Sequence, residues 1–198
     1  MKKNTVALIS VIVAVTIIAG GLYVIGNRSN GEEYTKTNDG LLTITEFNVS
    51  DESKTESFVD GTFFVLERNG DIHIKLVADI FVEAVDTGGA SIYIPDGLTI
   101  TDMLCSINGC TSDDYTAVWE TADADAKYHK FIEVARSLFR PTPEGGGAGM
   151  LIVEFDLDKS DIKDGAKSLA FLIGVGTDSS GEHISVGTVS KTICVPLS

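Results

Sequence analysis

Hydrophobic residues follow two different patterns along this chain. Residues 6–25 form one run without a charged side chain. Beyond residue 57, apolar and polar positions alternate instead, as in residues 71–76, where Ile72, Ile74 and Leu76 share one face. A period of two is typical of β-strands with one buried face. The pattern therefore predicts an apolar N-terminal segment followed by a β-rich region.

The N-terminal run has the length of a membrane-spanning helix, because about twenty residues at about 1.5 Å each match a hydrocarbon core of about 30 Å. Lys2 and Lys3 precede the run, and Glu32 and Glu33 follow it. The positive-inside rule then predicts a cytoplasmic N-terminus. A cleaved signal peptide is the alternative, although its apolar region is usually about 7–15 residues. We expect a single-pass anchor over residues 1–26 in the cell membrane and an extracellular ectodomain.

The remainder is predicted to be an all-β fold. Turn signals such as Asn69-Gly70 and Asp96-Gly97 recur between short alternating segments, and a helical period is almost absent. These features indicate an antiparallel β-sandwich. The strand candidates are residues 41–47, 61–67, 71–76, 91–94, 98–107, 115–120, 128–135, 151–157, 168–174 and 184–195.

Polar composition separates a tether from the domain. Residues 27–57 are rich in Asn, Ser, Glu and Asp around one strand candidate at 41–47. We interpret them as a polar tether with one strand, followed by a single ectodomain over residues 58–198, a usual size for one core.

The charge balance narrows the class of partner. The chain carries 29 Asp and Glu against 15 Lys and Arg, a formal charge of -14. Phosphate backbones require clustered Lys and Arg, so we expect no nucleic-acid partner. With 43% hydrophobic residues, the chain is also not of the disordered class.

Three cysteines allow one disulfide in an extracytoplasmic domain. Cys105 and Cys110 flank an Asn-Gly turn and are the disulfide candidate, a small hairpin staple. Cys194 is either the remaining thiol or the true partner of one of the other two. All three pairings stay open at this point.

Two sites fit the N-glycosylation acceptor pattern. Asn27 precedes Arg-Ser, and Asn48 precedes Val-Ser. An extracellular location would permit their use. Because the pattern is short, ordinary loop asparagines are the better interpretation of both.

No motif indicates catalysis. The glycine-rich residues 144–149 lack the Lys-Ser/Thr of a phosphate-binding loop, and the acidic residues 156–167 lack the Gly and Glu that a calcium EF-hand needs. Glu154 and Asp156 share a strand face and form a weak glycosidase pair. The only Trp, Trp119, is more often a packing residue in the core or at its rim than a sugar-stacking ring. We therefore expect a protein that is not an enzyme, with no catalytic residue, no metal site and no cofactor beyond a weak structural calcium ion.

Several segments together carry a family likeness. Residues 71–80, 90–104 and 130–136, and the strand at 149–156 after the glycine-rich turn, resemble the strands of cohesin modules. The likeness covers about residues 60–195, and carbohydrate-binding modules of the same sandwich superfamily share it. It implies a jelly-roll-like sandwich of about nine strands that binds a ligand. In cohesins one sheet face binds a dockerin, a small calcium-loaded module. The Cys105–Cys110 insertion and the N-terminal anchor depart from the family pattern.

The sequence thus favours a membrane-anchored, extracytoplasmic binding module, cohesin-like, that recruits a dockerin-type protein partner at the cell surface. The alternatives are a carbohydrate-binding module, whose partner is a polysaccharide, and a structural surface protein that associates with itself. A hydrolase with an unmarked site ranks last. The binding residues are not assigned from the sequence.

Overall fold

The computed structural model describes residues 40–50, 56–83, 89–108, 110–111, 115–123, 126–134, 147–158, 166–176 and 189–198. The predicted anchor at 1–26 lies outside these residues, as do positions 27–39 and 51–55 of the predicted tether. Among the described segments, no helix is long and apolar enough to cross a membrane. The compact unit that holds the strands extends from Asn38 to Ser198.

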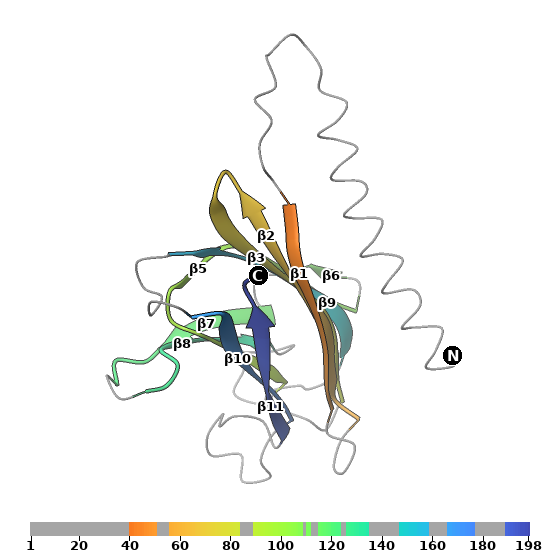
Figure 1. Ribbon diagram of the computed structural model, residues 1–198. Coiled ribbons are helices and arrows are strands. Elements are labelled where there is room, and N and C mark those ends of the chain that lie inside the picture. Colours follow the sequence, from red (N-terminus) through yellow and green to blue (C-terminus); the bar gives the residue numbers. More distant parts are fainter. Residues whose placement is uncertain are drawn as a thin grey trace, which may run out of the picture. The chain divides into compact units, whose positions relative to one another are not determined.

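The described residues form two antiparallel sheets (Figure 1). Sheet A has the order β1-β2-β3-β9-β5-β6, and sheet B has the order β11-β10-β4-β8-β7. The strands are β1 (Gly40–Ser50), β2 (Phe58–Arg68), β3 (Asp71–Val82), β4 (Ala90–Ile94), β5 (Leu98–Ile107), β6 (Cys110–Thr111), β7 (Thr116–Glu120), β8 (Lys130–Val134), β9 (Gly147–Leu157), β10 (Ser168–Val175) and β11 (Val189–Pro196).

For the residues that the structure describes, the all-β, antiparallel prediction is confirmed, and each strand candidate overlaps an observed strand. Two features were not predicted. The short strand β6 pairs with the end of β5. Strand β1 pairs with β2 along its whole length, from Gly40 to Ser50, and lies inside the compact unit. The domain therefore begins well before residue 58, and β1 belongs to sheet A instead of a tether.

The predicted Asn69-Gly70 turn joins β2 to β3. Asn69 has φ 54° and Gly70 has φ 89°, the left-handed values that a two-residue type I′ hairpin turn requires at both positions. Asn and Gly adopt these values at the lowest cost. The turn places Arg68 opposite Asp71 and thereby sets the register of the whole β2–β3 pair.

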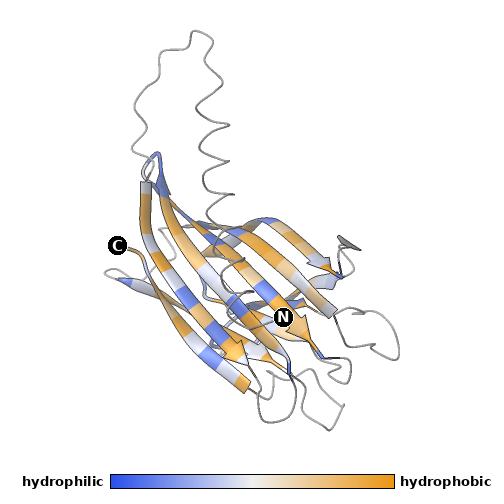
Figure 2. Ribbon diagram, turned by 90° about the vertical axis from the view of Figure 1, so that its right-hand side faces the viewer, coloured by the Kyte–Doolittle hydropathy of each residue, from blue (hydrophilic) through white to orange (hydrophobic). Residues whose placement is uncertain are grey.

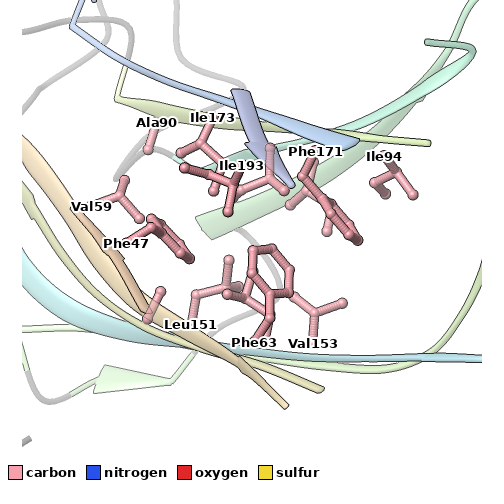
Figure 3. Packing of buried hydrophobic residues seen from close by; sticks show 14 of the residues in the cluster. Phe47, Val59, Phe63, Ala90, Ile94, Leu151, Val153, Phe171, Ile173 and Ile193 are labelled. Atoms are coloured by element: carbon pink, nitrogen blue, oxygen red, sulfur yellow. The ribbon is translucent and has the colours of Figure 1, made fainter. Parts of the chain in front are cut away.

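One hydrophobic core lies between the two sheets, the arrangement of a β-sandwich (Figure 3). Hydrophobic and hydrophilic residues alternate along the strands (Figure 2), and the apolar set of each strand faces inward. Phe63 and Phe155 of sheet A meet Phe171 of sheet B, with ring centroids 4.4 Å and 5.8 Å from that of Phe171. All three rings are fully buried, so they join the two layers at the centre of the core.

Candidate functional site

Three aromatic side chains line up across the outer face of sheet B. Trp119 of β7 lies opposite Phe131 of β8, and Phe131 lies opposite Tyr93 of β4. Ile132 and Ile92, chain neighbours of Phe131 and Tyr93, are fully buried in the core, so the alternation of strand side chains places Phe131 and Tyr93 on the outer face. Trp119 shares this face because it lies directly opposite Phe131. We call Trp119, Phe131 and Tyr93 the aromatic row.

The rings of the aromatic row differ in exposure. Tyr93 and Phe131 stack on each other, with centroids 4.9 Å apart and planes 21° apart. Tyr128 packs against Tyr93 at 5.9 Å. Trp119 is 42% exposed on the edge strand β7. Tyr93 and Phe131 thus cover one another, and the indole of Trp119 is the accessible end of the row.

A buried carboxyl group lies beside the aromatic row and holds the indole. The Nε1–H of Trp119 donates a hydrogen bond of 2.7 Å to Oε2 of Glu133. Glu133 is only 3% exposed, and this burial raises the pKa of its carboxyl group, while the bond from Trp119 lowers it. Burial also raises the pKa of Tyr93, and the charge of Glu133 raises it further. The hydrogen bond fixes the direction in which the exposed ring points.

Each member of the proposed carboxylate pair on sheet A contacts a side chain of β3. Lys75 Nζ lies 2.6 Å from Oε1 of Glu154, and His73 Nδ1 lies 2.6 Å from Oδ1 of Asp156. Both contacts join residues directly opposite each other on β3 and β9. Such cross-strand pairs stabilise the pairing of two strands, each by about 0.2–1 kcal/mol. Beside them lies a depression of about 540 Å³ whose lining includes His73, Asp156 and Thr99.

Other acidic side chains also have partners or lie outside the described residues. Glu120 contacts Lys130 at 3.3 Å, and His129 contacts Asp96 at 2.9 Å. Within the described part of the chain, no group of three His, Cys, Asp or Glu side chains could hold a metal ion. The segments outside the description include residues 113–114, 144–146, 159–165 and 181–188.

The structure describes the side chains of two of the three cysteines, Cys105 and Cys194. Cys105 is a buried free thiol whose burial raises its pKa to about 11, and Cys194 is an exposed free thiol. The register puts Cys110 opposite Ile107, and the side chain of Cys110 is outside the described residues. The Cys105–Cys110 disulfide stays a prediction.

The two glycosylation candidates also stay predictions. Asn48 is an exposed residue of β1, and its side chain forms a hydrogen bond with Asp60. Asn27 lies outside the described residues.

The aromatic row was not found from the sequence. The one available signal was the outward position of each aromatic residue in its own alternating segment. The alignment of the three rings depends on which strands pair and in which register. The chain matches no protein-family model, no curated protein and no solved structure.

Proposed function

We propose that this chain is a non-catalytic binding module, anchored in the membrane by residues 1–26, that recruits a protein partner outside the cell through the outer face of sheet B. The observation that carries the proposal is the aromatic row. Trp and Tyr dominate the energetic centres of protein interfaces, because large, stiff rings bury much area at little entropic cost. Trp119 combines this chemistry with high exposure and a fixed orientation.

The packing within the aromatic row favours a protein over a sugar. A saccharide ring stacks on the flat face of an aromatic ring, and Tyr93 and Phe131 cover one face of each other. A protein partner can instead contact ring edges and the indole together, as aromatic anchors do in packed interfaces.

The strand connections support the jelly-roll-like and cohesin-like parts of the proposal. Strand β9 lies between β3 and β5, and β4 lies between β10 and β8. Strands distant in sequence therefore form the centre of each sheet, as expected of a jelly roll. We propose a dockerin-type partner, in which case the calcium ions belong to the partner.

The test is a pull-down of secreted host proteins by the full chain in lipid nanodiscs, with calcium and then with chelator. We expect one partner to be retained in calcium. The Trp119→Ala variant should weaken its binding about thirtyfold, the loss of a 2 kcal/mol hot spot. Val118→Ala is the matched control, because Val118 is 43% exposed on the same strand but faces the other way. Equal retention by the Trp119→Ala variant would contradict the proposal.

A polysaccharide ligand is the second candidate, and it is favoured by the exposed indole of Trp119, whose orientation the buried Glu133 fixes. A sugar ring can stack on one accessible aromatic face. Affinity gels that contain cell-wall polysaccharides test it. Retardation of the native chain but not of the Trp119→Ala variant, without any protein partner, would replace the first proposal by this one.

A further inference from the structure

The outer face of sheet A carries an apolar stripe that is not part of the hydrophobic core. Val77 of β3 lies opposite Ile152 of β9, which lies opposite Leu104 of β5. The core on the other side of these strands is already filled by fully buried residues such as Leu76 and Leu151. We call Val77, Ile152 and Leu104 the apolar row. Leu104 is 46% exposed, whereas the solvent face of an antiparallel sheet is normally polar.

Three carboxylates adjoin this stripe. Asp60 of β2 lies directly opposite Asp79 of β3, and Glu46 of β1 lies opposite Thr62, two residues along β2. We call Glu46, Asp60 and Asp79 the acidic corner. Asp79 is two residues from Val77 on β3, about 7 Å along the strand, so the acidic corner and the apolar row share one surface.

The acidic corner has an energetic cost. Like charges directly opposite on paired strands destabilise the pairing. Burial raises the pKa of Asp60, and the charges of Asp79 and Glu46 raise it further, against a hydrogen bond from Asn48 that lowers it. A ligand that brings positive charge to this corner relieves the repulsion and gains affinity from it.

Charge decides which occupant fits. A second copy of this chain also carries a formal charge of -14, so pairing two such faces would bring the acidic corners together or against another acidic surface. An anionic lipid surface is repelled for the same reason. A basic segment with apolar side chains complements both halves of the surface.

We propose that the outer face of sheet A binds a basic, amphipathic protein segment, with its apolar side chains on the apolar row and its Lys or Arg side chains at the acidic corner. This surface is separate from the aromatic row, which lies on the other sheet. The module therefore offers two faces to two different ligands and acts as an adaptor.

A synthetic peptide of alternating Leu and Lys tests the proposal, with an alternating Ser and Lys peptide of the same charge as its match. Each peptide is titrated by calorimetry into the full chain in phosphatidylcholine nanodiscs, and empty nanodiscs provide the baseline. We expect the Leu-Lys peptide to bind about tenfold more tightly than the Ser-Lys peptide, since burial of leucine side chains supplies the difference. Equal binding of the two peptides would refute the apolar half of the site.

The Leu104→Asp variant separates this site from general attraction to an acidic protein. It removes an apolar anchor and adds a negative charge on an exposed position. The proposed site predicts about tenfold weaker binding of the Leu-Lys peptide, whereas charge attraction alone predicts tighter binding. Unchanged or tighter binding would overturn the proposal.

Two further variants locate the peptide. Asp60→Asn should weaken binding and reduce its salt dependence, because the corner loses one charge. Trp119→Ala should leave binding unchanged, since that residue belongs to sheet B. Weaker peptide binding by the Trp119→Ala variant would mean that the peptide binds at the aromatic row, and it would refute the assignment to sheet A. The proposed recruitment through sheet B is tested separately, by the pull-down of a secreted partner.

Discussion

Phe171 offers a sharp test of the two-layer core. It comes from β10 of sheet B, is fully buried, and contacts the rings of Phe63 and Phe155 from sheet A. Replacing a buried Phe with Ala costs about 3–5 kcal/mol, because transfer free energy is lost and a cavity remains. The two lost ring pairs, each worth about 0.5–1.5 kcal/mol, favour the upper end of this range. We expect Phe171→Ala to lower the free energy of unfolding by about 4–5 kcal/mol.

The measurement is urea unfolding of the full chain in nanodiscs, followed by far-ultraviolet circular dichroism and by Trp119 fluorescence. Domains of this size have about 5–15 kcal/mol of stability, so the variant should remain folded but close to its limit. Phe171→Leu keeps most of the volume and should cost about 1.5 kcal/mol. Leu104→Ala, on the exposed surface, should stay within about 0.5 kcal/mol of the native chain.

One result would refute this account of the core. A loss below about 1 kcal/mol for Phe171→Ala, with an unchanged dependence on urea, would mean that this ring does not join the two sheets. If the exposed Leu104→Ala variant lost as much stability as is expected for Phe171→Ala, about 4–5 kcal/mol, the measurement would not be reporting on the core.

Three further predictions concern single positions. The pKa of Asp60 is raised in the folded state, so the ionised form of this side chain destabilises the fold. Asp60→Asn should therefore raise the free energy of unfolding near pH 7. This gain should vanish as the pH falls below 3.8, the ordinary pKa of the group, and urea unfolding at a series of pH values measures it. A Cβ at Gly149 would lie 1.8 Å from the backbone oxygen of Ser106, so Gly149→Ala should lower the midpoint of thermal unfolding strongly, while Gly40→Ala, with open space around it, should not. A thiol reagent should modify exposed Cys194 in the folded protein and leave buried Cys105 unmodified, and modification of Cys105 as fast as that of Cys194 would contradict its burial.

The sequence alone was informative wherever the determining interactions are local. The alternation in residues 71–76 and 151–157 predicted β3 and β9, because side chains on a strand point to opposite faces whatever the partner strand is. The Asn69-Gly70 turn was predicted for the same reason, since the conformational preference for left-handed values belongs to the two residues themselves.

Only the tertiary structure decided which strands are neighbours. Strand β9 lies between β3 and β5, although many residues separate it from both in the chain. This pairing brings Lys75 to Glu154 and His73 to Asp156. Each carboxylate of the weak glycosidase pair therefore contacts a side chain of the neighbouring strand, which the sequence alone did not indicate. The same applies to β1, whose polar surroundings suggested a tether but whose register with β2 places it in sheet A.

The candidate binding surfaces also depend on which strands are neighbours. Trp119, Phe131 and Tyr93 are isolated aromatic residues in the sequence and become one row only through the registers of β7, β8 and β4. Local side-chain alternation determined the strands and their inward faces. The shared core determined the partner and register of each strand, because only one pairing buries all the apolar faces together, and the outer surfaces follow from that choice.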